Sequence, residues 1–423
     1  MAKSILNSQI KNLSTLLELD MSYFIKGGFW LSAGTLVTTI GGIFLSSLFA
    51  RFWPKDVYGQ FTFIISAIGF LSITTLPSLS QVLIQSVAEG KEATYRVATK
   101  TLLKWSLIGT TLLLLGSLYF FLRNNTILSI AAFITALAFP LYASTSLFSS
   151  YLMGKKNFRA ASFYSTFSQV VTILFTALAL WKAGYLLIVV FCNIWTPAII
   201  KSLITLKYLK SVKKAKVDKT YHRLGIALSI SGAMMLGIDY FDRFAIPLFL
   251  SFEANASWAI ALIIPLQIHS ILKILLDLAQ PKIAELKKGD FRKILLKKSF
   301  QLEILVGAAV VLYIIFAEPI FKLLYPQYMN SVNISRIYAV SLLYFPNNLF
   351  GFFLIKRRVT NRALISSVIY TVVSAFSLLI FIWLWGLIGA AISKIFARII
   401  LIIITQVIFS QELRKIRVQA SEK

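Results

Sequence analysis

Twelve long apolar segments run along this 423-residue chain and limit what it can fold into. A helix that crosses the hydrocarbon core of a membrane needs about 20 mostly apolar residues. Hydrophobic residues make up 58% of the chain, and the mean hydropathy of +0.78 lies outside the range of soluble globular domains. We therefore expect an all-α polytopic membrane protein with about 12 transmembrane helices. The expected spans are 28–50, 58–84, 104–122, 127–153, 160–181, 185–206, 225–250, 256–283, 299–317, 333–355, 363–384 and 387–409.

Basic residues are divided unevenly between the two sides of these spans. Cytoplasmic loops of membrane proteins carry an excess of Lys and Arg, so this asymmetry predicts that both termini are cytoplasmic. It also explains the net charge of +27, and no nucleic-acid partner is expected. Of the 43 Lys and Arg residues, 32 lie in segments 1–27, 86–104, 154–159, 207–223, 282–298, 356–362 and 410–423. The tryptophans expected at the outer interface are Trp53, Trp181, Trp258, Trp383 and Trp385.

Residue types that carry enzyme chemistry are scarce in the sequence. Cys192 is the only cysteine, and the only histidines are His222 and His269. These residues cannot form an intramolecular disulfide, a cysteine cluster for a metal or a histidine-based metal site. The expected outer connections are also too short for an extramembrane catalytic surface. We expect no cofactor, no metal and no enzyme activity, with a membrane glycosyltransferase or polymerase as a disfavoured alternative and a non-transporting scaffold as a still less favoured one.

The chain repeats some of its features in its second half. Ala88-Glu89 and Ala284-Glu285 are 196 residues apart, and both pairs lie at the inner end of an expected helix. The repeat predicts two six-helix lobes related by a pseudo-two-fold axis along the membrane normal. The expected parts are a cytoplasmic N-terminal segment (1–27), an N-lobe (28–206), a basic cytoplasmic linker (207–224), a C-lobe (225–409) and a cytoplasmic tail (410–423).

The seventh expected helix carries three charges, Asp239, Asp242 and Arg243, among apolar residues. One charge at bilayer depth costs about 2.5–3.5 kcal/mol on insertion scales, so these residues imply a protein interior or a wet cavity. Asp239 and Arg243 share a helix face, so Arg243 can neutralise one carboxylate. We leave two alternatives open for the other carboxylate. It either couples transport to an ion such as H⁺ or Na⁺, or forms a structural ion pair with a base such as Lys394.

The segment between the first two expected helices resembles a known family. It is similar to the polysaccharide-transporter branch of the multidrug/oligosaccharidyl-lipid/polysaccharide (MOP) exporter superfamily, which has an Ala-Arg followed by a Gly-Pro-Glu-x-Tyr-Gly-like turn. Ile238–Phe244, Leu324–Tyr328 and Gly386–Ala391 also resemble segments of that branch, although Ser257-Trp258 replaces its usual Gly-x-Tyr. The matching residues of the turn are Ala50, Arg51, Pro54, Asp56, Tyr58 and Gly59, with Trp53 in place of the family's usual glycine.

The resemblance implies a Wzx-type flippase of the bacterial inner membrane that works by alternating access. Its substrate would be an oligosaccharide linked to undecaprenyl pyrophosphate, such as an O-antigen or a related surface-polysaccharide repeat unit. The implied partners are this lipid-linked substrate, the lipid bilayer, and a polysaccharide polymerase with its chain-length regulator. The alternative within the same superfamily is an exporter of drugs or other small molecules.

A diphosphate head group needs cations along its path through the membrane. Arginine suits phosphate because its planar fork can bind two oxygens at once and stays charged. The expected substrate-binding residues are Arg51 at the outer end of the first helix, Arg243 in the seventh, and Lys394 and Arg398 one turn apart in the twelfth. Arg51 has a second interpretation, because its side chain can simply reach the membrane interface.

Overall fold

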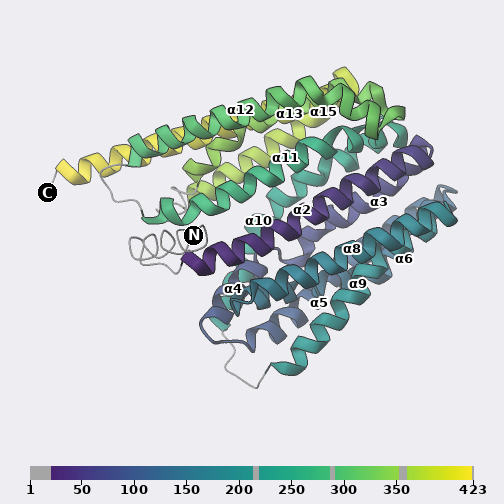
Figure 1. Cartoon of the computed structure of the whole chain (residues 1–423), viewed down its shortest axis with the longest axis horizontal. Helices are drawn as coiled ribbons and strands as arrows, with labels where there is room; N and C mark the ends of the chain where they lie inside the picture. The colour runs from purple at the N-terminus through teal and green to yellow at the C-terminus, as the bar shows by residue number, and fades with distance from the viewer. Residues whose placement is uncertain (1–20, 213–218, 286–290, 352–359, 422–423) are drawn as a thin grey trace, which may run out of the picture. The chain divides into compact units, whose positions relative to one another are not determined.

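A computed structural model describes residues 21–212, 219–285, 291–351 and 360–421 (Figure 1). All regular elements among the described residues are helices, which confirms the prediction of an all-α protein. Nine of these helices are long and apolar enough to cross a membrane. The expected count of twelve stays a prediction, and most of the expected N-terminal segment lies outside the described residues.

The first of two compact units consists of Met1–Leu45 and Thr74–Ser229, as far as they are described. Asn125 and Asn157 start two of its helices, because each side chain accepts a hydrogen bond from the backbone N–H three residues later. Tyr95 and Tyr151 stack in its core, with ring centroids 4.6 Å apart. The helices are α2 (Met21–Phe52), which continues into the second unit, α4 (Leu79–Ala88), α5 (Thr94–Leu122), α6 (Thr126–Ser144), α7 (Leu147–Gly154), α8 (Phe158–Lys182) and α9 (Leu186–Ser211).

Two of the expected single spans are broken. The span 58–84 is interrupted at Leu76, whose φ of +49° leaves the helical region directly before Pro77. A proline disfavours helical backbone at the residue before it, which explains the break. The span 127–153 is interrupted at Thr145-Ser146, where both hydroxyls donate to carbonyl oxygens of the preceding turn. Such bonds compete with the helix ladder and favour a bend.

The second unit consists of Ser46–Ile73 and Ile230–Lys423, as far as they are described. It therefore groups α3 with the C-terminal helices, whereas the predicted N-lobe boundary runs later in the chain. Its elements are α3 (Lys55–Leu71), most of η1 (Ser72–Thr75), most of α10 (Lys219–Phe249), α11 (Phe252–Glu285), α12 (Phe291–Leu324), η2 (Pro326–Ser331), α13 (Val332–Val340), η3 (Ser341–Asn347) and α15 (Thr360–Ser421).

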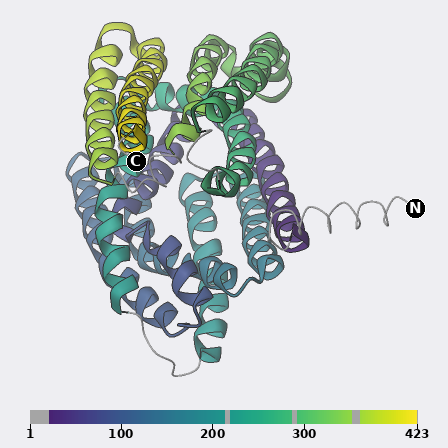
Figure 2. The same ribbon diagram turned by 90° about the vertical axis from the view of Figure 1, so that its left-hand side faces the viewer.

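α15 is a helical hairpin of two arms that lie side by side in yellow-green and yellow (Figure 2). The first arm covers residues 360–384 and the second covers 387–421, close to the expected last two spans. Between them, Trp385 and Gly386 have non-helical backbone angles, and Gly386 has φ +57°. This left-handed conformation is accessible to glycine without the steric penalty of a side chain. The turn thus allows the chain to reverse within two residues.

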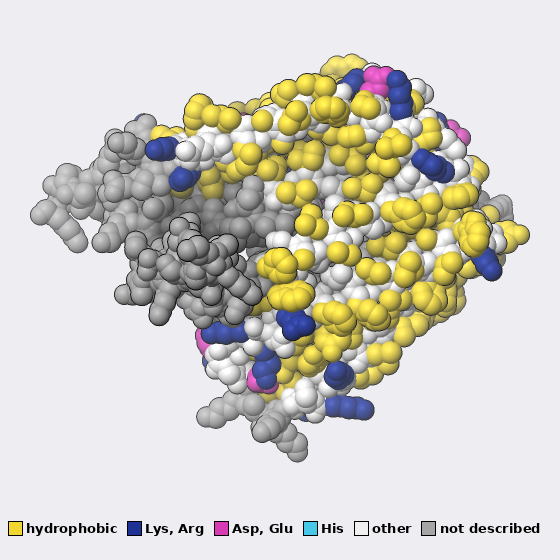
Figure 3. All heavy atoms as spheres, viewed as in Figure 1, with side chains coloured by type: hydrophobic (Ala, Val, Ile, Leu, Met, Phe, Trp, Pro, Cys, Tyr) yellow, Lys and Arg dark blue, Asp and Glu magenta, His cyan; other side chains and the backbone are white. Residues whose placement is uncertain are grey.

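Hydrophobic side chains cover much of the helix surface, and dark-blue Lys and Arg side chains lie mostly toward the helix ends (Figure 3). Trp181, Trp383 and Trp385 are exposed, as expected of interfacial anchors. Two of the tryptophans expected at the interface are buried instead, Trp53 at 4% and Trp258 at 0% exposure. Trp53 packs on Phe49 and the indole of Trp258 binds a carboxylate, so internal contacts determine both positions.

Candidate functional site

Asp242 is a buried carboxylate with three partners in the second unit. Its side chain is 1% exposed, and its Oδ1 accepts the backbone N–H of Arg243 at 2.8 Å. Its Oδ2 accepts the Trp258 indole N–H at 3.1 Å and lies 3.2 Å from Lys394 Nζ. The three side chains come from α10, α11 and the second arm of α15. The Asp242 carboxylate therefore connects α10 to both α11 and the second arm of α15.

The surroundings of this ion pair are apolar and tightly packed. Small residues at the contact, among them Ala245, Ala261 and Ala390, let the helices approach closely. Tyr338 of α13 closes the cluster by meeting the Trp258 ring edge to face, with centroids 6.0 Å apart. Because Asp242 is buried, its attraction to Lys394 is weakly screened by solvent, and each partner would be costly to leave alone.

Arg398, one turn after Lys394, is held by aromatic rings. Its Cζ lies 3.9 Å from the centroid of the Tyr344 ring and 5.4 Å from that of Tyr370. Tyr344 belongs to η3 and lies 3.4 Å from the His269 Nε2 of α11, whereas Tyr370 belongs to the first arm of α15. A cation above an aromatic face is stabilised without a carboxylate. Arg398 has no ion-pair partner among the described side chains, so its N–H groups are candidates to bind an anionic acceptor.

Asp239 has an environment unlike that of Asp242, although both belong to α10. Its side chain is exposed, and no cation of the described residues forms an ion pair with it. Arg398, Lys394 and Arg243 nevertheless act on it electrostatically. A carboxylate at this depth without a direct partner needs water or a bound ion around it.

The expected pairing of the Arg243 side chain with a carboxylate of its own helix is wrong for the described structure. Only the backbone N–H of Arg243 contacts Asp242, and the Nε atom is buried without a hydrogen-bond partner. The physical reason is competition, because Trp258 and Lys394 already occupy Oδ2 of Asp242. Arg243 acts electrostatically on Tyr58 of α3 instead.

The cluster as a whole carries one surplus positive charge. Asp239 and Asp242 face three cations, Arg243, Lys394 and Arg398. Arg398 follows Gly386 by twelve residues, which corresponds to about 18 Å along the helix axis. An uncompensated positive charge at that depth attracts anions strongly, since little solvent screens it.

Arg51 does not join this cluster. Its Nη2 donates to the backbone oxygen of Leu323 at 2.6 Å, in the last turn of α12. Gln327 Nε2 in turn lies 3.4 Å from the Arg51 carbonyl oxygen, and Ser47 Oγ donates to the Leu324 carbonyl at 2.9 Å. Cations at helix C-termini are favoured by the helix dipole. Arg51 thus connects the end of α2 to the end of α12.

The turn that resembles the transporter family forms a helix joint. Gly59 of α3 approaches α11 so closely that an added Cβ would lie 1.8 Å from the Phe252 carbonyl oxygen. Asn255, which is fully buried, donates through Nδ2 to the Gly59 carbonyl and to Thr62 Oγ1, both at 3.0 Å. Gly59 and Asn255 are 196 residues apart, the same offset that separates the repeated Ala-Glu pairs.

The sequence identified the charges of the cluster but not its aromatic partners. Tyr344 and Tyr370 lie at least 28 residues from Arg398 in the chain, and no local spacing connects them. Trp258 was expected at the interface, whereas it is the hydrogen-bond donor to Asp242. A polar aromatic residue within an apolar span is the only signal that could have pointed to these residues.

The sequence and the fold were compared with those of known proteins. The sequence matches none of the curated proteins. Solved structures with the same fold include the lipid II flippase MurJ in its inward closed conformation, with TM-score 0.69 and 17% identity over 92% of this chain and 90% of that one. An inward-facing multidrug resistance MATE family transporter of the MOP superfamily gives TM-score 0.67 and 13% identity over 92% and 99% of the two chains.

A MOP superfamily transporter from Pyrococcus furiosus gives TM-score 0.62 and 13% identity over 93% of this chain and 96% of that one. At these identities the likeness establishes the fold, which is that of MATE transporters and MurJ. The model of the family described as "Polysaccharide biosynthesis protein" matches residues 24–277, more than half of the sequence. The chain is therefore a multi-pass membrane protein that belongs to the polysaccharide biosynthesis protein family.

Proposed function

We propose that this protein is a flippase for an oligosaccharide linked to undecaprenyl pyrophosphate. The observation that carries the proposal is the surplus positive charge formed by Arg243, Lys394 and Arg398 at membrane depth, in a chain of the polysaccharide biosynthesis family. A diphosphate is the anionic part of such a substrate, and its sugars need a hydrated path. The likeness to MurJ, a lipid II flippase, supports a lipid-linked substrate.

Each cation has a different role in the proposal. Arg398 presents its N–H edges to the diphosphate while the Tyr344 ring fixes its orientation. Arg243 supplies a second donor, because its buried Nε has no hydrogen-bond partner. Lys394 adds charge but is held by Asp242, so it cannot move freely with the substrate. Arg51 is bound to the end of α12 and lies outside this set.

We also propose a coupling ion, a membrane location and a place in polysaccharide assembly for this protein. Asp239 is the candidate for coupling to H⁺ or Na⁺, since it has no ion-pair partner among the described side chains. The protein would work by alternating access in the bacterial inner membrane, with both termini cytoplasmic. Its product would pass to a polysaccharide polymerase and its chain-length regulator, for O-antigen or a similar surface polysaccharide. The protein would perform no chemical step itself.

The test uses purified protein in proteoliposomes that contain the lipid-linked oligosaccharide. Flipping should require Arg398, so Arg398→Ala should abolish it, and Arg398→Lys should restore part of it because the charge returns without the fork. Arg123→Ala is a matched control, because Arg123 also lies over a tyrosine ring, 5.7 Å from the Tyr119 centroid, but on an exposed helix end. Full flipping by Arg398→Ala would overturn the assignment of this residue.

The coupling role of Asp239 has its own test. Asp239→Asn should flip substrate without responding to an imposed proton or sodium gradient, and it should keep its thermal stability because no ion pair is lost. A gradient response equal to wild type would exclude Asp239 as the coupling group.

An exporter of small molecules is the second candidate, and the fold shared with MATE transporters favours it. A gene deletion separates the two functions. Loss of a flippase should leave lipid-linked repeat units on the cytoplasmic side and remove surface polysaccharide. Loss of a drug exporter should change drug sensitivity and leave surface polysaccharide intact.

A further inference from the structure

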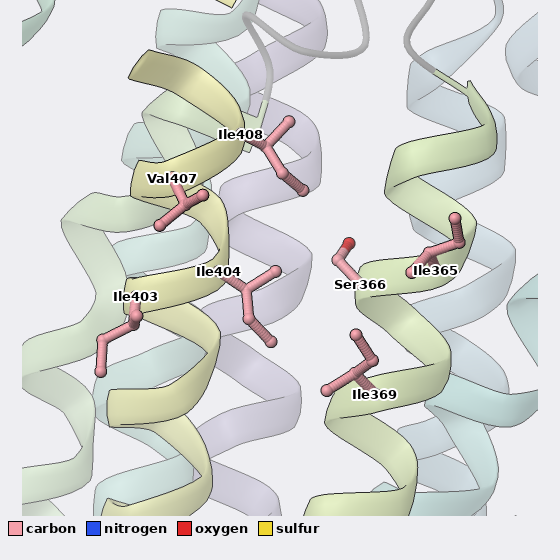
Figure 4. Close-up of a pocket in the computed structure, with 7 residues that line it drawn as sticks. All are labelled: Ile365, Ser366, Ile369, Ile403, Ile404, Val407 and Ile408. Carbon is pink, nitrogen blue, oxygen red and sulfur yellow. The ribbon is translucent and has the colours of Figure 1, made fainter. Parts of the chain in front are cut away.

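Lys201 of α9 is the only charged residue of the sequence between positions 186 and 206. It contrasts with the groove between the two arms of α15, whose lining of isoleucine, valine and one serine offers no charge to a ligand (Figure 4). α9 continues to Ser211, beyond the expected span 185–206. Lys201 is therefore ten residues, about 15 Å, from the end of the helix and fifteen residues, about 22 Å, from its start. Its charge lies near the middle of a membrane-spanning helix.

Lys201 lies at the centre of the buried face of α9. Ala198 and Thr205, within about one turn of it on the same side, are 0% and 3% exposed. Ile199 and Leu203 lie on the opposite side and are 49% and 64% exposed. Because residues three and four apart share a face of a helix, the Lys201 side chain points toward neighbouring helices and not toward lipid.

Tyr142 of α6 is the neighbour of the Lys201 ammonium group. Lys201 Nζ lies 5.1 Å from the centroid of the Tyr142 ring. One turn further along α9, Thr205 Oγ1 donates to the Thr145 carbonyl oxygen at 3.3 Å, so α6 and α9 are in contact at this depth. A lysine ammonium has three N–H donors, and no described residue forms a hydrogen bond or an ion pair with Lys201.

Carboxylates are absent from the sequence around Lys201. No Asp or Glu occurs between Glu92 and Asp218. Among the described residues of the first unit, the acidic ones are Glu89 and Glu92, which lie between α4 and α5, and each pairs with a lysine. A charge at membrane depth is costly without a counter-charge, and these residues supply none to Lys201.

The second unit contains a similar arrangement. There Arg398 lies over the Tyr344 ring, without an ion-pair partner among the described side chains. Arg398 follows Lys201 by 197 residues and Tyr344 follows Tyr142 by 202, close to the offset of 196 that separates the repeated Ala-Glu pairs. Both halves of the chain thus place a cation over a tyrosine ring at membrane depth.

We infer that Lys201 binds an oxyanion of the transported substrate within the first unit. The inference rests on the proposed function, which supplies an anionic substrate that crosses the membrane. Such a substrate has two sources of oxyanion, its diphosphate and any carboxylate on its sugars. A lysine ammonium is a point charge with rotatable donors, so it suits a single oxygen from either source, whereas the fork of arginine suits two oxygens at once.

The experiment measures the affinity of the purified full chain in nanodiscs for two soluble probes, pyrophosphate and glucuronate. Lys201→Met should weaken the binding of at least one of them about tenfold, because a hydrogen bond between charged groups is lost. Weaker pyrophosphate binding identifies the diphosphate as the source of the oxyanion, and weaker glucuronate binding identifies a sugar carboxylate. Lys201→Arg keeps the charge and should retain part of the affinity.

Lys207→Met is the matched control. Lys207 Nζ also lies over a tyrosine ring, 5.6 Å from the Tyr164 centroid, but Lys207 is exposed near the end of α9. Its replacement should leave both affinities unchanged.

Thermal unfolding without added anion separates anion binding from a structural role of Lys201. Lys201→Met should unfold at the wild-type temperature or a few degrees above it, because the substitution removes an uncompensated charge. A cation that stabilises the fold would lower the unfolding temperature when it is removed. Lys201→Gln, which is neutral but still polar, serves in the binding measurement if the methionine variant does not fold.

Two outcomes would overturn the inference alone. The first is an unchanged affinity for both anions in Lys201→Met while Arg398→Ala weakens pyrophosphate binding, which leaves the proposed function standing. The second is an equal loss in Lys201→Met and Lys207→Met, which would show a general effect of surface charge. If the wild-type protein binds neither anion, the proposed function fails together with this inference.

Discussion

Two polar regions of the second unit differ in the formal charge that they carry. At the joint between α3 and α11, Asn255 donates to Gly59 and Thr62, and no formal charge is involved. In the cluster of α10 and α15, Asp242 and Lys394 form an ion pair, but neither Asp239 nor Arg398 has an ion-pair partner within the described residues, and Arg398 lies over the rings of Tyr344 and Tyr370. The hydrogen bonds of the joint connect α3 to α11, whereas the cluster contains two charged side chains that form no ion pair with a described residue.

Within the cluster, too, paired charges differ from charges that have no ion-pair partner. We propose that Asp242 and Lys394 have a structural role, since Asp242 is buried, accepts a hydrogen bond from Trp258 and forms an ion pair with Lys394. Asp239 and Arg398, which interact electrostatically with each other, are the groups that we propose bind an ion and a phosphate. We therefore expect substitutions at the structural positions to act on stability, and substitutions at the others to act on transport.

The largest expected effect comes from breaking the buried pair. Asp242→Asn should lower the free energy of unfolding by about 3–5 kcal/mol, because Lys394 then keeps an uncompensated charge in an apolar site. Thermal unfolding in detergent measures the change. Adding Lys394→Met should recover much of the loss, since it removes the orphaned charge. A double variant no more stable than Asp242→Asn would argue against direct coupling between the two residues.

A somewhat smaller loss of stability is expected at the joint. Gly59→Ala places a Cβ against the Phe252 carbonyl oxygen, so α3 and α11 must separate, at a cost of about 1–3 kcal/mol. Gly116→Ala is the control, because nothing lies within 4 Å of an added Cβ in that helix. Alanine there should stabilise by about 0.5–1 kcal/mol. Thermal unfolding of the two variants should therefore shift in opposite directions.

Much of the fold could be predicted because the bilayer imposes a simple rule of length and polarity. The expected spans 160–181 and 185–206 correspond closely to α8 and α9. The breaks at Leu76 and at Thr145 were missed, since local backbone strain and hydroxyl bonds do not alter hydropathy. Proline at 77 was visible in the sequence, but it does not say whether a helix bends or stops.

The candidate site could be predicted only as far as charge allowed. Asp239, Asp242, Lys394 and Arg398 were all singled out because charges are rare in apolar spans. The pairing of Asp242 with Lys394 was one of two open alternatives, and the side-chain pairing expected for Arg243 is not formed. Tertiary packing decides which carboxylate meets which cation. Positions 152 residues apart in the chain provide no periodicity from which to infer it.

A moderate effect on transport is expected from the ring beneath Arg398. Tyr344→Leu removes the aromatic face and should weaken the hold on the guanidinium by about 0.5–2 kcal/mol, which corresponds to a few-fold loss of flipping. Tyr344→Phe keeps the face and should retain most of the activity. Flipping rates in proteoliposomes at matched protein density measure both. Equal losses in the two variants would show that the hydroxyl near His269, and not the ring, is the important group.

The smallest effect is expected at Arg51, which tests whether the boundary between structural and transport residues is placed correctly. Its guanidinium binds the Leu323 carbonyl at the exposed end of α12, so Arg51→Ala should cost only about 0.3–1 kcal/mol of stability. Arg51→Lys should restore part of this, because any cation interacts favourably with a helix C-terminus. Flipping should stay near the wild-type rate in both variants, since no diphosphate contact is assigned to this residue. A loss of flipping by Arg51→Ala comparable to that of Arg398→Ala, with unfolding temperature unchanged, would move Arg51 from the structural set to the substrate path.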